Sequence, residues 1–187
     1  MWQILKTARV RDLPEKTTKL RPEEAYTLIE NALEKNRCKI VERRPLDYLK
    51  VKQGSLNGTS PKTAKKQVEF QFFPDGSGTR IVSFSEIATD WAELTVFGNV
   101  AAAVIATIFL WIAKDVQAYA ENGRSGFWGW LAHAYGYPDL HATMFLVNLT
   151  RGLAAFLIAA VAVEVLIVLY VYPRKEVFAL EILEAVP

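Results

Sequence analysis

Two apolar stretches dominate the second half of the chain. Residues 153–172 form a run of 20 residues with a single charge, at Glu164, and residues 95–113 form an uncharged run of 19. At 1.5 Å per residue, each run makes a helix of about 30 Å, which is the thickness of the hydrocarbon core of a bilayer. The pattern predicts two transmembrane helices joined as a hairpin.

The second run is apolar enough to insert in spite of its carboxylate. Twelve of its 20 residues are Leu, Ile, Val or Phe. These residues contribute about −4 to −7 kcal/mol on an insertion scale, whereas one charge in the middle of a span costs about +3 kcal/mol. We therefore expect the helix to insert with Glu164 inside the membrane.

Shorter patterns in the first 90 residues are typical of an α+β domain. An apolar stripe that begins at Pro22 predicts a helix over residues 22–36. Residues 12–21 and 54–66 are polar and contain turn-forming residues, so we expect loops there. Apolar and polar positions alternate in five predicted strands, the last two joined by a turn at 74–78: residues 3–10, 39–42, 48–53, 68–73 and 79–84. We predict an antiparallel sheet with one helix on its apolar face.

Three features follow one another along the first part of the chain: the Gly54-Ser55 pair, the Gly76–Thr79 turn and the start of a long helix near Ile87. In this order residues 1–100 resemble small prokaryotic α+β modules of the β-α-β-β-β type that are attached to membrane helices. The resemblance implies the fold of the first domain, and it implies no activity.

The predicted elements divide the chain into five parts. The last part is half apolar and too short to span a bilayer, so we expect it to dock on the soluble domain, as an edge strand in preference to a helix. The parts are a cytoplasmic α+β domain at 1–87, a first transmembrane helix at 88–118, an extracytoplasmic loop with an interfacial aromatic helix at 119–142, a second transmembrane helix at 143–172 and a cytoplasmic tail at 173–187.

Charge and cysteine content narrow the function classes. The net charge is +2, and residues 1–94 carry an excess of four positive charges, which is too diffuse for a nucleic-acid protein but compatible with an anionic lipid surface. Cys38 is the only cysteine, so no internal disulfide can form, and we expect it to be a small core residue. We find no cleavable signal peptide, and Arg174 and Lys175 follow the second span. We therefore expect a multi-pass protein of the cell membrane with both termini in the cytoplasm.

Small residues recur at helical spacing in both apolar runs and predict faces where helices approach closely. We expect the two spans to pack on each other or on a neighbouring subunit, which makes a homo-oligomer or a larger membrane complex the expected assembly. The predicted packing residues are Gly98, Ala102 and Ala106 in the first span and Gly152, Ala155 and Ala159 in the second.

Glu164 is the strongest functional candidate, because an ionisable residue inside a membrane usually has a role. Asn99 and Thr107 of the first span lie within one helical turn of its depth, so a hydrogen bond to either could hold the helices together. Proton or ion handling by Glu164 is the alternative. A hairpin with a carboxylate in its second helix resembles the ring subunit of rotary ATPases, but this chain has a longer outer loop, an added soluble domain and no glycine-rich helices.

One set of residues has the chemistry of a metal site. His133, Asp139 and His141, with Glu121 upstream, could hold zinc or copper, although their spacing matches no common motif and interfacial polar residues are the alternative interpretation. The chain shows no glycine-rich phosphate loop, no Ser-His-Asp pattern and no cysteine cluster. We therefore expect no catalytic residue and no cofactor.

Three functions fit this sequence. The first is a non-enzymatic integral membrane protein, an accessory or scaffold subunit that displays a cytoplasmic α+β interaction module. The second is a transport or ion-translocation component that uses Glu164. The third is a membrane-anchored sensor with an apolar ligand pocket under the sheet, lined by Phe70, Phe72 and Phe84.

Overall fold

A computed structural model describes residues 13–123, 126–133 and 140–187. The chain divides into two compact units: the chain up to Glu93 together with Ile167–Pro187, and Leu94–Leu166. The strand predicted at residues 3–10 lies outside the described residues.

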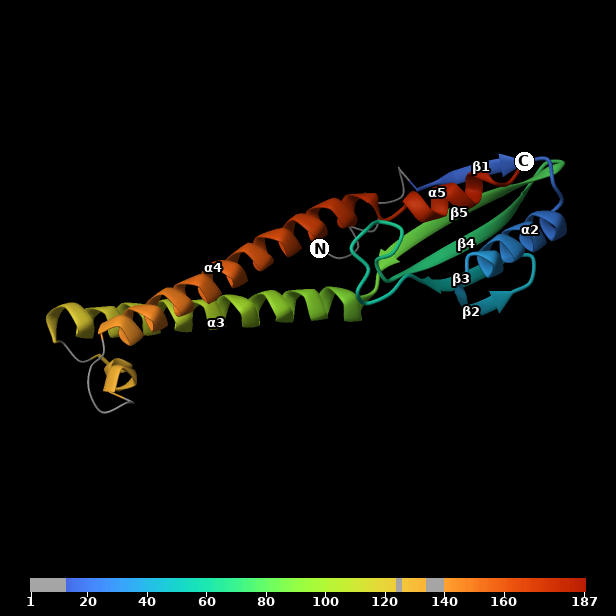
Figure 1. Ribbon diagram of the computed structural model, residues 1–187. Helices are drawn as coiled ribbons and strands as arrows, with labels where there is room; N and C mark the ends of the chain where they lie inside the picture. The colour runs from blue at the N-terminus through green and yellow to red at the C-terminus, as the bar shows by residue number, and fades with distance from the viewer. Residues whose placement is uncertain (1–12, 124–125, 134–139) are drawn as a thin grey trace, which may run out of the picture. The chain divides into compact units, whose positions relative to one another are not determined.

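The first unit is a five-stranded antiparallel sheet with two helices on one of its faces (Figure 1). The strand order is β1-β5-β4-β3-β2, and consecutive strands from β2 to β5 are neighbours. The sheet has one strand more than the β-α-β-β-β order. The elements are β1 (Glu15–Thr18), α2 (Pro22–Lys35), β2 (Lys39–Arg44), β3 (Tyr48–Gln53), β4 (Lys66–Asp75), β5 (Gly78–Ile87) and α5 (Val177–Glu184).

The predicted helix and four of the predicted strands are confirmed, with longer strand ends. Side chains of β3, β4 and β5 alternate between a buried face and an open face, as the polar–apolar pattern indicates. The β4–β5 hairpin closes through Gly76 and Ser77, and Gly76 has a φ of +57°, a conformation that favours glycine. The buried face of the sheet forms one core with α2 and α5.

The expectation of a loop at residues 12–21 is wrong, because β1 forms there and pairs with β5. The segment Glu-Lys-Thr-Thr carries no apolar residue, so it gives no hydrophobic signal for a strand. Its core-facing residues bind the end of the chain instead. Thr18 Oγ1 donates to the carbonyl of Pro187 at 2.7 Å, and Lys16 Nζ donates to the carbonyl of Val186.

The tail forms the helix α5 and not the expected edge strand, and the sheet therefore carries two helices where one was predicted. Four apolar residues of α5 are buried in the core beside α2 and the sheet: Phe178, Ala179, Ile182 and Leu183. Residues spaced one, three and four apart lie on one face of a helix, whereas a strand would place every second residue on one face. This spacing explains why the tail buries its apolar residues as a helix.

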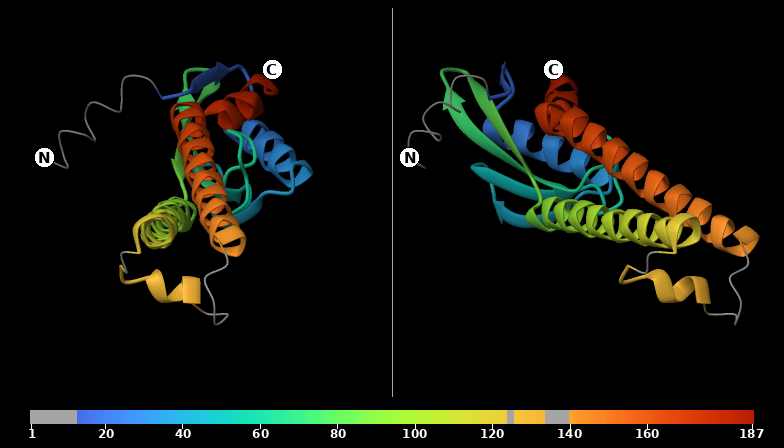
Figure 2. Two further views of the ribbon diagram at one scale, coloured as in Figure 1. Left: turned by 60° about the vertical axis from the view of Figure 1, so that its left-hand side comes forward. Right: turned by 90° about the vertical axis from the view of Figure 1, so that its left-hand side faces the viewer.

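The second unit consists of most of two long helices and the segment that joins them. They are α3 (Thr89–Asn122) and α4 (Leu140–Val171), with a short 3₁₀-helix, η2 (Gly129–His133), between them. The second long helix begins at Leu140, three residues before the predicted bound of 143. Among the described residues of the segment 119–142, the predicted aromatic helix is reduced to η2. Near this joining segment, Ala113 and Val116 of α3 pack on Val147 of α4, and Figure 2 shows the two helices from further sides.

Both helices are long and apolar enough to cross a membrane. Only 11% of the most apolar 18-residue window of α3 and 6% of that of the second segment are buried. In a soluble protein such windows are usually buried in a core, so the exposure of these helices is compatible with a membrane environment.

Candidate functional site

The residues predicted to act inside the membrane do not meet one another. Asn99 Nδ2 donates to the carbonyl of Thr95 at 3.0 Å, and Thr107 Oγ1 donates to the carbonyl of Ala103 at 2.9 Å, so both bond within α3. Glu164 is half-buried and has no hydrogen bond or ion pair with the described part of the chain. The structure therefore does not show the expected bond between Glu164 and either residue of α3.

The small residues predicted for helix packing divide into two groups. Ala106 is buried and Ala102 is half-buried. In α4, Gly152, Ala155 and Ala159 are exposed. A Cβ atom added at Gly98 or Gly152 would have no heavy atom within 4 Å. Within the hairpin, α4 instead buries another stripe, made of Thr143, Val147, Thr150 and Ala154.

The metal site stays a prediction. Asp139 lies outside the described residues, and the side chain of His133 is not among the described side chains either. Within residues 13–123, 126–133 and 140–187, no group of three or more His, Cys, Asp or Glu side chains is placed to hold a metal ion.

The clearest concentration of unusual chemistry lies in the first unit, around the loop at residues 54–65. This loop joins β3 to β4 and folds back on itself. Gly54 has a φ of +84°, and a Cβ atom at Gly58 would lie 1.9 Å from the carbonyl oxygen of Thr63, so glycine is required at both positions. Ser60 and Thr63 close a tight turn, with their hydroxyl oxygens 2.7 Å apart.

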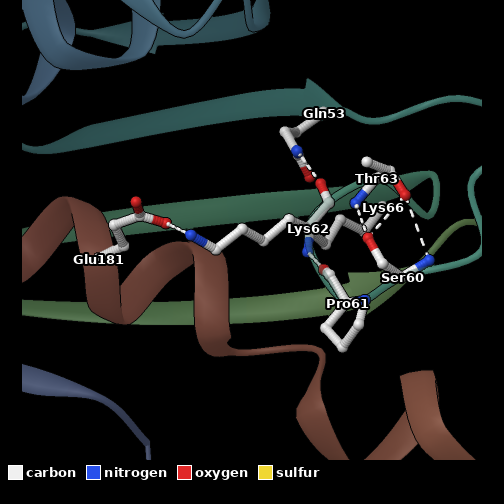
Figure 3. A network of polar contacts seen from close by, with 7 residues as sticks. All are labelled: Gln53, Ser60, Pro61, Lys62, Thr63, Lys66 and Glu181. Atoms are coloured by element: carbon white, nitrogen blue, oxygen red, sulfur yellow. Dashed lines mark hydrogen bonds and ion pairs between the residues drawn. The ribbon is translucent and has the colours of Figure 1, made fainter.

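Three side chains from the surrounding elements hold this loop (Figure 3). Gln53 Nε2 donates to the carbonyl of Lys62, and Lys66 Nζ donates to the carbonyl of Pro61. Lys62 Nζ forms an ion pair with Glu181 of α5 at 2.7 Å. The loop is therefore bonded to β3, β4 and α5 at once.

The loop also contacts the ends of both long helices. Trp91 of α3 is 5% exposed, and its Nε1 donates to the carbonyl of Gly58 at 3.2 Å. Its ring belongs to a small apolar cluster with Ala64 of the loop and Val171 at the end of α4. We call the set of loop 54–65, Lys66, Trp91, Val171 and Glu176 the junction.

Lys66 is the most unusual residue of the junction because it is completely buried. Burial lowers the pKa of its ammonium group to about 8, although the charge of Glu176 opposes the shift. Its Nζ also lies 3.5 Å from the carbonyl of Lys175 and 5.6 Å from the centre of the Phe178 ring. This buried amine binds segments of the chain itself.

Glu176, in the turn before α5, is the counter-charge of Lys66. Its Oε1 accepts a hydrogen bond from the backbone N–H of Ser85 at 3.1 Å, at the part of β5 that extends beyond β1. Its Oε2 and the hydroxyl of Ser85 are both buried without a partner in the described residues. Buried polar atoms of this kind are costly, so the arrangement is sensitive to the loss of any member.

The stability of the protein should therefore depend on pH through Lys66. The pKa of this group is about 8 in the folded state and 10.5 as its ordinary value, so the unfolded chain binds more protons between these values. Stability should rise by up to about 3 kcal/mol as the pH increases from 8 to 10.5. Thermal unfolding of the full chain in detergent, compared with that of Lys66→Met, isolates this group. Equal pH dependence in the two proteins would contradict the assignment.

Cys38 packs against the core. Burial raises the pKa of its thiol to about 11. Because the thiolate is the reactive form, we expect maleimide to label Cys38 at pH 7.5 roughly 100-fold more slowly than an exposed cysteine. Ser77→Cys in a Cys38→Ala background, at the exposed tip of the β4–β5 hairpin, is the matched control. Similar rates at the two positions would refute the prediction.

Comparison with protein-family models, with curated proteins and with solved structures finds no match. The interpretation of this chain therefore rests on its own residues.

Sequence reasoning missed the junction. Lys66 follows another lysine at the end of a polar loop, which is the ordinary pattern of an exposed residue. One signal was available, because Lys66, Val68, Phe70 and Phe72 share one face of β4 by alternation. The same alternation corrects the predicted ligand pocket: Phe70 and Phe72 are buried in the core, whereas Phe84 lies on the opposite face of the sheet.

Proposed function

We propose that this protein is a non-enzymatic integral membrane protein whose helical hairpin crosses the bilayer twice and carries the α+β module at the cytoplasmic surface. In this role it is an accessory or scaffold subunit of a membrane assembly. The observation that carries the proposal is the exposure of α3 and α4, two apolar helices of 34 and 32 residues whose most apolar windows are mostly exposed. Each is longer than the roughly 20 residues that a bilayer requires.

The connections between the hairpin and the module support a scaffold role. Only Ala88 separates β5 from α3, and α4 continues through the three residues of η3 (Tyr172–Arg174) toward α5. The first turn of α3 and the last turn of α4 both belong to the unit that contains the sheet. Both connections between the module and the hairpin are therefore short, as expected of a module that works at the membrane surface.

The residues at these connections suit a membrane surface. Tyr170 and Tyr172 are exposed at the end of α4, and the guanidinium of Arg174 lies 4.8 Å from the centre of the Tyr170 ring. Aromatic rings and cations gather at the headgroup level of membrane proteins, and cations are more frequent on the cytoplasmic side. This placement supports the orientation with both termini in the cytoplasm.

The proposal is tested by extraction from membranes. Membranes from cells that produce the full chain are washed with alkaline carbonate and then treated with a mild detergent. We expect the protein to remain in the carbonate pellet and to be released only by detergent. Release by carbonate would reject the proposal, because two inserted helices do not leave the bilayer under these conditions.

A second candidate function, transport or ion translocation, is favoured by one observation. Glu164 has an apolar environment and no partner in the described residues, as expected of a carboxylate that binds a transported ion. The Glu164→Gln variant separates the candidates in vesicles that contain the purified protein. Loss of ion flux in Glu164→Gln with unchanged assembly would support transport. No ion flux with either the unmodified protein or the variant would support the scaffold role.

A further inference from the structure

The contact between α3 and α4 is closed near the joining segment and open toward the other end. One stripe of α4 is buried at Thr143, Val147, Thr150 and Ala154. The same heptad positions continue at Leu157, Val161 and Glu164, where the side chains are only half-buried. The facing stripe of α3 changes in the same way, from Ala113 and Ala106, which are buried, to Ala102 and Asn99, which are half-buried.

Two polar residues with unused hydrogen-bonding capacity, Glu164 and Asn99, lie on this open part of the stripe. Glu164 lies on it in α4 and has no partner in the described residues. On α3, Asn99 uses Nδ2 for a bond within its own helix, and its Oδ1 is buried without a partner. In an apolar environment, an unpaired carboxyl group and the second amide N–H of Asn99 both favour a contact that supplies a partner.

Asn99 and Glu164 lie at nearly the same depth in the hairpin. Trp91 and Val171 belong to one apolar cluster and provide a common starting level. Asn99 is eight residues from Trp91 along α3, and Glu164 is seven residues from Val171 along α4. At 1.5 Å per residue, the two side chains therefore lie about 12 Å and 10 Å from that level.

From these observations we propose that a second copy of this chain binds against the open part of the stripe, so that Glu164 of each copy pairs with Asn99 of the other. The inference rests on the proposed membrane insertion. A twofold axis along the membrane normal keeps the two copies in the same orientation and at the same depth. Residues of equal depth on different helices then meet reciprocally, and one contact forms two pairs.

The chemistry of the two side chains is complementary. A carboxyl oxygen accepts and a carboxamide N–H donates, so the two side chains can form a hydrogen bond. The Nδ2 of Asn99 carries a second N–H beyond the one that it donates to the carbonyl of Thr95. The chain thus supplies both the donor and the acceptor of the pair.

The backbone beside Asn99 leaves room for an approaching helix. A Cβ atom at Gly98 would have no heavy atom within 4 Å, and Ala102 is small. Small residues at a spacing of four let a second helix come close enough for side-chain hydrogen bonds.

Disulfide formation between differently tagged copies tests the inference. In a Cys38→Ala background, Asn99→Cys and Glu164→Cys are placed on separate chains that carry different tags and are produced together. After mild oxidation of the membranes, we expect a disulfide-linked dimer that contains both tags, because such a bond requires Cα atoms less than about 7 Å apart. The matched control pair is Val100→Cys with Val163→Cys, both exposed and one position away, which should give little dimer.

The possible results separate the inference from the proposed function. If the chain stays in the membrane but no disulfide-linked dimer with both tags forms, the inference is wrong and the proposed function is unaffected. An intrachain disulfide in the Asn99→Cys, Glu164→Cys double variant, with no link between copies, would show closure of one hairpin and would also overturn it. Recovery of the chain in the carbonate supernatant would reject the proposed function and the inference together.

Discussion

Replacing Glu176 by alanine should destabilise the folded protein by about 2–4 kcal/mol. The substitution removes the counter-charge of the buried ammonium of Lys66 and leaves the Ser85 N–H without its acceptor. Removing one of two opposite charges is more costly than removing both when the remaining charge is buried, because that charge then stays uncompensated. Thermal unfolding of the full chain in detergent should show a decrease in Tm of roughly 10 °C or more.

Two further variants separate charge from hydrogen bonding. Glu176→Gln keeps an oxygen that can accept from Ser85 and removes only the charge, so we expect a smaller loss than with alanine. The double variant Glu176→Ala, Lys66→Met removes both charges, and we expect it to recover part of the stability lost in the single variant, by about 1–3 kcal/mol. Unchanged Tm in Glu176→Ala, or additive effects in the double variant, would show that the two groups are not coupled.

Replacing Trp91 by alanine should have the largest effect of any single substitution in the junction. The change removes a buried indole that contacts loop 54–65 and the end of α4, and it leaves the carbonyl of Gly58 without its donor. Large aromatic deletions in a packed site cost about 3–5 kcal/mol. We expect a lower Tm and, because the loop contains Lys62 and Lys65, faster cleavage there by trypsin.

Trp91→Phe and Trp130→Ala are the controls for this experiment. Phenylalanine keeps most of the ring but not the N–H, so it should cost about 1–2 kcal/mol. Trp130 is 59% exposed in the segment between the long helices, and its replacement should change stability by less than about 0.5 kcal/mol. Equal trypsin cleavage in Trp91→Ala and in the unmodified protein would show that Trp91 does not hold the loop.

The helices and most strands were predictable because their signal is local. The 3.6-residue stripe of α2 and the two-residue alternation of β4 follow from which face is buried, and each pattern can be read within a few residues. The long apolar runs of α3 and α4 can likewise be read directly from the sequence. What the sequence did not supply is the pairing of polar segments, as in β1, whose threonine and lysine bind the end of the chain.

The candidate site was harder to predict because its members are distant in the sequence. Lys66 lies 110 residues before Glu176, and each resembles an ordinary surface charge in its own segment. The burial of Lys66 involves α5, whose Phe178 ring lies 5.6 Å from its Nζ, and α5 is distant from β4 in the sequence. In contrast, Glu164 was identified at once, since a lone carboxylate in an apolar run is visible in the sequence itself.

The central claim is that the chain crosses a bilayer twice and leaves its sheet module and its chain ends on one side. Labelling with a membrane-impermeant maleimide tests it most directly, in sealed spheroplasts and in a Cys38→Ala background. Ser77→Cys reports the module, and Asn122→Cys, exposed at the end of α3, reports the segment between the helices. The account predicts labelling of Asn122→Cys in intact spheroplasts and of Ser77→Cys only after lysis. Labelling of both positions, or of neither, before lysis would contradict it.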